Sequence, residues 1–159
     1  WKVLEEFKAD GRARSIGVSN FQQHHLEKLI DGSDTVPAVN QVELHPYFQN
    51  VRVAEFCCEN DICLEAWSPL ARGTIVTDPL VIQIAEAHGC TPAQAILAWH
   101  LAKGYVVFPK SVTPARLLEN MQAIDIDLTV AEVQELNTLD RGEAGRTGFN
   151  PDTMTRYVE

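Results

Sequence analysis

Two cations and a hydroxyl group, Lys110, Ser111 and Arg116, follow one another closely at the start of a predicted helix. Thr113 is a typical N-cap and Pro114 is typical of the first helical position. Acidic side chains are normally favoured there, because the helix dipole is positive at that end. The cations and the backbone N–H groups therefore predict a phosphate site. A solvated lysine and arginine on an ordinary strand-to-helix loop is the alternative that the spacing leaves open.

A second polar group lies inside the predicted strand 38–44. Asn40, Gln41 and Glu43 interrupt a run that should be almost continuously apolar if helices cover both faces of the sheet. Buried polar groups need hydrogen-bond partners. The strand is therefore expected to line something other than a dry core. A half-exposed edge strand is the alternative.

Strands and helices alternate along the chain. Strands are expected at 14–18, 38–44 and 62–67, a buried strand is expected at 106–108, and residues 71–77 are expected to be a loop. Helices are expected at 1–10, around 26–30, at 51–59 with Asn50 as its cap, at 78–87, at 91–103, from 113 and from 129. This alternation predicts parallel strands and an α/β fold. No GxGxxG follows a strand, so a doubly wound dinucleotide-binding fold has no support.

Polar residues gather where the predicted strands end, which is the face that holds the active site in a TIM barrel. We therefore expect the C-terminal half, strands five to eight, of a TIM (β/α)8 barrel with parallel strands and flanking helices, since a full barrel needs roughly 250 residues. The half-barrel would occupy residues 1–140. Residues 141–159, rich in glycine, would form a surface tail or flap. The chain begins within a helical pattern, as a fragment would.

Composition and charge argue against several classes of partner and site. The 159 residues carry a net charge of −9, which argues against nucleic acid or an anionic membrane as partner. No apolar run is long enough to span a membrane. The five histidines show no metal-ligand spacing, so no metal site is expected. The four cysteines lack a CxxC pair and are expected to be reduced, mostly buried thiols of a cytosolic protein.

Four motifs in one order resemble the aldo-keto reductase family and cover essentially the whole chain, with the bacterial 2,5-diketo-gluconate reductase-like branch as the nearest impression. They are Arg14-Ser-Ile-Gly-Val-Ser-Asn-Phe21, Asn40-Gln-Val-Glu-Leu-His-Pro46, Ala66-Trp-Ser-Pro-Leu70, and Pro109-Lys-Ser111 followed by Arg116 and Glu119-Asn120. Phe108 departs slightly from the family pattern, which usually has an aliphatic residue there.

The resemblance implies an NADP-dependent oxidoreductase that converts an aldehyde or ketone to an alcohol by hydride transfer. It implies that Ser19, Asn20 and Gln41 hold the nicotinamide carboxamide and that Trp67 stacks on the nicotinamide ring. Ser68 and Leu70 would line the pyrophosphate. The adenosine ribose, its 2′-phosphate and the adenine would be held by a larger set: Lys110, Ser111, Val112, Arg116, Glu119 and Asn120.

The resemblance also implies that the family's catalytic Asp, Tyr, Lys and His precede this stretch. Tyr47, Tyr105 and Tyr157 are no substitutes by position, so no catalytic residue is assigned and the 159-residue chain alone is expected to be inactive. We expect a small-molecule carbonyl substrate, a cytoplasmic location, and a partner that is either the missing N-terminal half-barrel or a second copy. Two alternatives stay open: a non-catalytic nucleotide-binding half-barrel, and a fragment of a sugar-phosphate-binding βα barrel.

Overall fold

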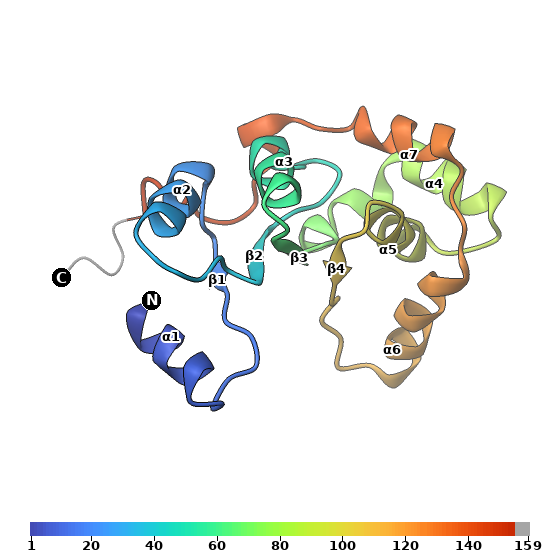
Figure 1. Cartoon of the computed structure of the whole chain (residues 1–159). Coiled ribbons are helices and arrows are strands. Elements are labelled where there is room, and N and C mark those ends of the chain that lie inside the picture. Colours follow the sequence, from blue (N-terminus) through green and yellow to red (C-terminus); the bar gives the residue numbers. More distant parts are fainter. Residues whose placement is uncertain (155–159) are drawn as a thin grey trace. The chain divides into compact units, whose positions relative to one another are not determined.

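The computed structural model describes residues 1–154, in which helices and strands alternate (Figure 1). The strands are β1 (Val18–Ser19), β2 (Val39–Glu43), β3 (Cys63–Trp67) and β4 (Val106–Val107). The α-helices are α1 (Lys2–Ala9), α2 (Gln23–Asp31), α3 (Val51–Glu59), α4 (Pro79–Ala87), α5 (Pro92–Ala102), α6 (Pro114–Met121) and α7 (Val130–Asn137). Short 3₁₀ helices occupy Ala71–Gly73, Ile75–Thr77, Gln122–Asp125 and Gly142–Gly145.

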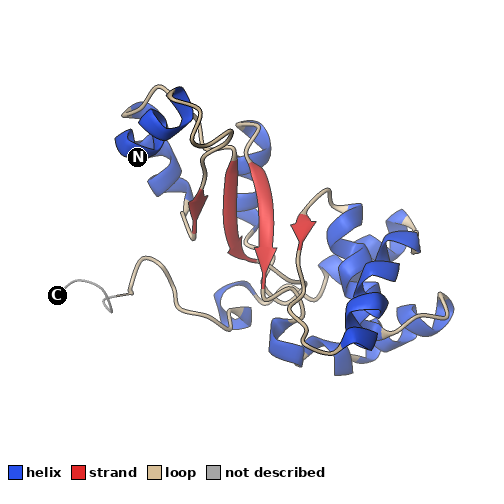
Figure 2. Cartoon of the chain, turned by 90° about the horizontal axis from the view of Figure 1, so that it is seen from below, coloured by secondary structure: helices blue, strands red, loops and turns tan. Residues whose placement is uncertain are grey.

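The strands form one four-stranded parallel sheet in the order β1-β2-β3-β4. In the register of the first pair, Val18 lies opposite Asn40 and Ser19 opposite Gln41. β2 and β3, of five residues each, are the longest strands and lie side by side in Figure 2. The strand order follows the chain order, as it does in a βα repeat. The α/β class and the parallel strands predicted from the sequence are confirmed.

Three local predictions were wrong. The strand expected at 14–18 shrinks to Val18–Ser19, although Ala38 N–H still donates to Ile16 C=O. The strand expected to be buried at 106–108 has Val106 and Phe108 more than 40% exposed, because β4 is the last strand of the sheet in the described structure. The expected loop 71–77 contains two 3₁₀ helices.

Helix ends follow the sequence signals, except that two predicted caps, Asn50 and Thr113, make no side-chain cap hydrogen bond. Thr91 and Thr129 form the predicted capping boxes of α5 and α7, and Asp78 caps α4 by accepting from Leu80 N–H. Asn50 precedes α3 as predicted, but its side chain makes no cap hydrogen bond and its φ is +48°. Asparagine tolerates that left-handed conformation better than most residues. No helix among the described residues is long and apolar enough to cross a membrane.

The chain divides into two compact units. Unit 1 comprises residues 1–42, 50–65 and the described part of 149–159, and unit 2 comprises residues 43–49 and 66–148. In unit 1, buried side chains include Leu26, Val42, Val53 and Leu64. In unit 2, α5 is buried along most of its length, and Trp99, Leu97 and Ile96 are almost completely buried.

Candidate functional site

A hollow of about 450 Å³ lies on unit 2 between the start of α6, the N-terminal end of α5 and the loop after β3. Seven of the twelve residues predicted to hold the cofactor line it: Leu70, Lys110, Ser111, Val112, Arg116, Glu119 and Asn120. Gly73, Val76, Ala93 and Thr113 complete the lining. The structure therefore brings together the predicted adenosine and 2′-phosphate residues with one of the predicted pyrophosphate residues.

The turn from β4 into α6 presents the cations. Ser111 Oγ accepts a hydrogen bond from Thr113 N–H, and this small turn leads into Pro114 at the first helical position. Thr113 stands at the N-cap but makes no side-chain cap hydrogen bond, unlike the cap residues of α4, α5 and α7. The first N–H groups of α6 are thus left without a side-chain acceptor from Thr113, as an anion-binding helix start requires.

The two cations themselves are exposed. Among residues 1–154, neither Lys110 nor Arg116 makes an ion pair with a carboxylate, whereas Arg12 and Arg146 each pair with a neighbouring one. Positive charge that is not neutralised by the chain's own carboxylates is available to a phosphate.

Glu119 is fixed by the neighbouring helix start. Its Oε1 accepts from the Thr91 hydroxyl at 2.7 Å, and its backbone C=O accepts from Gln94 Nε2 at 2.9 Å. Thr91 and Gln94 are also the two members of the α5 capping box. The pair that caps the start of α5 therefore also holds Glu119, Thr91 through the side chain and Gln94 through the backbone.

Trp67 and Ser68 stand at the end of β3. Trp67 C=O accepts from Leu44 N–H, which continues the alignment of β2 and β3 beyond Glu43. Ser68 has φ of +53°, in the left-handed region that few serines adopt. The side chain of Trp67 is half-buried and lies against Gly148, whose added Cβ would be 2.4 Å from the ring atom Cη2. Trp67 and Ser68 are not among the lining residues of the hollow.

Ser19, Asn20 and Gln41 come together in unit 1. Ser19 Oγ and Asn20 N–H both donate to Gln41 C=O, at 3.1 and 2.8 Å, and Asn20 Nδ2 donates to Ser19 Oγ. Gln41 Nε2 donates to Glu65 Oε2 at 3.1 Å. The three residues predicted to hold one carboxamide are thus linked by hydrogen bonds at the carboxyl end of β1 and on the paired strand β2.

The polar residues of β2 find partners, as the sequence required. Asn40, fully buried, donates from Nδ2 to Phe21 C=O and accepts at Oδ1 from Phe21 N–H. Glu43 is 1% exposed and belongs to unit 2. Its carboxylate faces His45 Nε2 at 3.2 Å and accepts from Thr147 N–H, from the Thr147 hydroxyl and from Gly148 N–H.

Burial by itself raises the pKa of Glu43, but these hydrogen bonds, from His45, Thr147 and Gly148, together outweigh it and lower the pKa to about 2. Glu43 is therefore a carboxylate at neutral pH. Sequence reasoning noted that Glu43 needs partners but did not place it in a site. Two of its partners, Thr147 and Gly148, lie more than 100 residues away, so no local signal identifies them.

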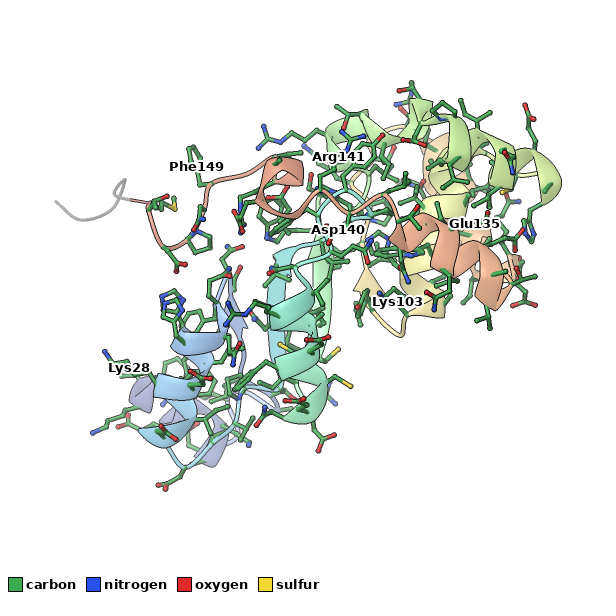
Figure 3. The ribbon with its side chains drawn as sticks, turned by 90° about the horizontal axis from the view of Figure 1, so that it is seen from above. Lys28, Lys103, Glu135, Asp140, Arg141 and Phe149 are labelled. Atoms are coloured by element: carbon green, nitrogen blue, oxygen red, sulfur yellow. The ribbon has the colours of Figure 1, made fainter. Side chains whose placement is uncertain are left out.

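Residues 140–148 are built onto the loop 43–49 within unit 2. Asp140 Oδ1 accepts from Gln49 N–H, Arg141 N–H donates to Tyr47 C=O, and the Arg141 guanidinium lies 3.5 Å from the centre of the Tyr47 ring. Figure 3 shows Asp140 and Arg141 on the chain that leaves α7. Gly145 packs on the Tyr47 carbonyl, where an added Cβ would be 1.7 Å from the oxygen. This part of the expected tail is an anchored segment.

The prediction about the thiols needs a correction. The expectation of mostly buried cysteines was wrong: Cys57 is buried, Cys90 is half-buried, and Cys58 and Cys63 are exposed.

His24, His25 and Asp152 lie close together in unit 1. His25 Nδ1 accepts from Gln22 N–H, so the proton of the neutral ring is on Nε2, the atom facing Asp152. A protonated Nε2 has no lone pair for a metal.

Comparisons with known proteins agree with the motifs. A model of the aldo/keto reductase family matches residues 1–141. Over 154 residues the chain is 42% identical to glyoxal reductase of Bacillus subtilis, covering 97% of this chain and 55% of that protein. It is 42% identical over 154 residues to the methylglyoxal reductase DkgA of Escherichia coli, covering 96% and 55%. The chain spans about half the length of the curated relatives it matches.

Solved structures are similar over the same extent. The apo form of Gox0644 superposes with a TM-score of 0.94 at 45% identity, covering 97% of this chain and 56% of that one. A mutant of Gox0644 in complex with NADPH gives a TM-score of 0.93 at 45% identity, again over 97% and 56%.

Proposed function

Since the chain belongs to the aldo/keto reductase family, we propose that it provides the cofactor-binding part of an NADP-dependent reductase that converts aldehydes or ketones to alcohols. The observation that carries the proposal is the hollow on unit 2, where Lys110 and Arg116 flank the uncapped start of α6. Two exposed cations beside a helix start that the Thr113 side chain does not cap fit a phosphate. The Gox0644 structure with NADPH supports the choice of cofactor.

In this proposal the hollow takes the adenosine end of NADP. Lys110, Ser111 and Arg116 would hold the 2′-phosphate and its ribose, with Val112 against the sugar. Glu119, already oriented by Thr91, and Asn120 would contact the adenine. A charge-assisted hydrogen bond from arginine to phosphate is worth about 1.5–3 kcal/mol, which makes Arg116 a strong contributor to the preference for NADP over NAD.

The other predicted residues would hold the remainder of the dinucleotide. Ser68 and Leu70 would line the pyrophosphate, and Trp67 would offer its flat face to the nicotinamide ring. Ser19, Asn20 and Gln41 would bind the carboxamide, whose N–H₂ and C=O need both an acceptor and a donor. When bound, the nicotinamide supplies the hydride for the carbonyl carbon.

We propose that this stretch corresponds to strands five to eight of the barrel, and that the 159 residues alone do not turn over. The parallel strand order and the absence of a candidate proton donor among the site residues support this. The proton donor would come from a first half-barrel, or two copies would associate, in a cytoplasmic protein. Glyoxal and methylglyoxal are the first substrates to test, because relatives are named for them.

NADPH binding to the 159-residue chain tests the proposal. We expect saturable quenching of tryptophan fluorescence, and about tenfold weaker binding in Arg116→Ala for NADPH but not for NADH. Arg52→Ala, an exposed arginine on α3, is the matched control and should bind as the unaltered chain does. Equal loss of NADPH and NADH affinity, or no loss, would contradict the 2′-phosphate assignment.

A second assay addresses turnover. NADPH oxidation is followed with glyoxal, methylglyoxal and a panel of other aldehydes. No rate above background is expected from the chain alone. A protein-dependent rate would overturn the view that the proton donor is supplied from elsewhere.

A further inference from the structure

The strongest unexplained feature of unit 2 is the buried carboxylate of Glu43. Three of its contacts come from two consecutive residues: Thr147 N–H and hydroxyl at 2.6 Å each, and Gly148 N–H at 2.9 Å. A fourth comes from His45 Nε2 at 3.2 Å. The Glu43 side chain is 1% exposed, and three of its four contacts go to one short segment. It therefore fixes the position of that segment.

The segment that Glu43 holds is the one that touches Trp67. A Cβ at Gly148 would be 2.4 Å from Cη2 and 3.3 Å from Cζ3 of the Trp67 ring, and 2.9 Å from Glu43 Oε2. Only a residue without a side chain fits between the carboxylate and the indole. Glu43, Gly148 and the far edge of Trp67 are therefore stacked in direct succession.

The segment is also held just before this point. Arg141 N–H donates to Tyr47 C=O, and the Arg146 guanidinium lies 4.2 Å from the centre of the Phe48 ring. Gly145 leaves no space above the Tyr47 carbonyl. Residues 141–148 therefore cannot swing away from Trp67 without breaking contacts along their length.

We propose that Glu43 is a positioning residue: by pinning Thr147 and Gly148 it sets the position of the Trp67 ring on which the nicotinamide stacks. This inference rests on the proposed function for the role of Trp67. It assigns to Glu43, and to the 146–148 segment, a part in binding the nicotinamide end of the cofactor that none of the predicted site residues takes.

The proposal separates the two ends of the cofactor. Within the described residues, the hydrogen bonds of the Glu43 carboxylate go to His45, Thr147 and Gly148, and none of these lines the α6 hollow. Glu43 therefore has no direct hydrogen bond through which to change the adenosine end. We call the contacts of Glu43 with Thr147 and Gly148 the pin. If the pin is lost, Trp67 occupies its stacking position for a smaller fraction of the time. The apparent dissociation constant of the nicotinamide end rises in inverse proportion to that fraction.

Glu43→Gln in the 159-residue chain, with Glu135→Gln as control, tests this. Both substitutions remove one negative charge, but Glu135 is exposed on α7. Two probes are titrated by calorimetry: reduced nicotinamide mononucleotide and adenosine 2′,5′-bisphosphate. We expect Glu43→Gln to weaken the mononucleotide about fivefold and to leave the bisphosphate within about twofold. Glu135→Gln should alter neither.

A spectroscopic readout tests the pin without ligand. Emission of the Trp67→Phe variant is subtracted from that of the parent, in the presence and absence of Glu43→Gln, to isolate the Trp67 signal. We expect this signal to move to longer wavelength when Glu43 is replaced, because the ring loses its cover. Thr147→Val, which removes only the hydroxyl contact with Glu43, should give a smaller shift in the same direction and serves if Glu43→Gln does not fold.

Equal weakening of both probes, an unchanged mononucleotide affinity, or a mononucleotide that the unaltered chain does not bind while the bisphosphate binds would each overturn the positioning role. If the unaltered chain binds neither probe, the proposed function fails. The Trp67 emission then decides alone: an unchanged signal overturns the pin, and a shifted one supports it.

Discussion

The two polar regions of unit 2 use their hydrogen-bonding groups in opposite ways. In the pin around Glu43, the hydrogen-bonding groups are satisfied within the chain: the carboxylate is buried and has four contacts, from His45, Thr147 and Gly148. The hollow at α6 keeps its two cations exposed, and the described part of the chain supplies no carboxylate to Lys110 or Arg116. A group that is satisfied internally stabilises the fold, whereas one left open is available to a ligand.

This contrast predicts that substitutions in the first region change stability, and change affinity only through the position of Trp67. Substitutions in the second region should change affinity with little effect on stability. The distinction is quantitative, because a buried network couples its members and an exposed cation is surrounded by water. Each of the following changes tests one side of it.

Gly145→Ala should have the largest effect on stability. The new methyl group would be 1.7 Å from Tyr47 O, a backbone atom that cannot turn aside. We expect the free energy of unfolding to fall by about 4 kcal/mol, measured by urea denaturation. Gly142→Ala, in the same 3₁₀ helix, meets no atom within 4 Å and has only its φ of +53° against it. It should cost about 1 kcal/mol.

An equal cost for both glycine variants would show that residues 141–148 are not packed on the loop 43–49 in solution. The pin would then have no fixed partner.

Glu43 should make stability depend on pH in acid. Its carboxyl pKa is lowered from 4.5 to about 2 on folding, so the unfolded chain binds a proton more readily than the folded one. The stabilisation is complete above pH 4.5 and is lost as the pH falls toward 2, by a total of about 3 kcal/mol.

Urea denaturation between pH 2 and 7 measures this loss, and Glu43→Gln should flatten the curve below pH 4.5. His100 adds a separate loss of stability as the pH falls from 6.5 to about 4, since burial above all lowers the pKa of its imidazole from 6.5 to about 4. A Glu43→Gln curve that keeps the full acid slope below pH 4.5 would contradict the role given to the carboxylate.

Thr91→Ala should lower both the stability of the chain and its affinity for NADPH, because Thr91 caps α5 and also donates to Glu119. Loss of the cap is expected to cost about 1 kcal/mol of stability. Loss of the contact with Glu119 should weaken NADPH a few-fold without changing the preference for NADPH over NADH. Thr129 caps α7 in the same way, away from the hollow, so Thr129→Ala should cost stability alone.

The features that could be predicted from the sequence are those that local interactions determine, and the features that were missed depend on distant ones. Helix α3 was predicted with its observed bounds, and the capping boxes at Thr91 and Thr129 were recognised, because those signals lie within four residues. The length of β1 was not, since pairing with β2 decides it.

The candidate site shows the same limit. Lys110, Ser111 and Arg116 were recognised because one turn of chain places them. The role of Glu43 was missed because Thr147 and Gly148 reach it across more than 100 residues. Glycines at 145 and 148 were the only trace of that packing in the sequence, and glycine-rich segments are as typical of a surface tail.

Arg116→Ala should have the smallest effect on stability and so gives the sharpest test of the contrast. An exposed arginine with no carboxylate partner in the described structure should change the free energy of unfolding by less than about 0.5 kcal/mol, although it weakens NADPH about tenfold. Raising the salt concentration should reduce NADPH affinity in the unaltered chain more steeply than in the variant, because screening acts on the charge that the variant lacks. If Arg116→Ala destabilised the chain as strongly as Gly145→Ala, Arg116 would be a structural residue. The contrast between a region that stabilises the fold and a hollow whose cations are available to a ligand would then be wrong.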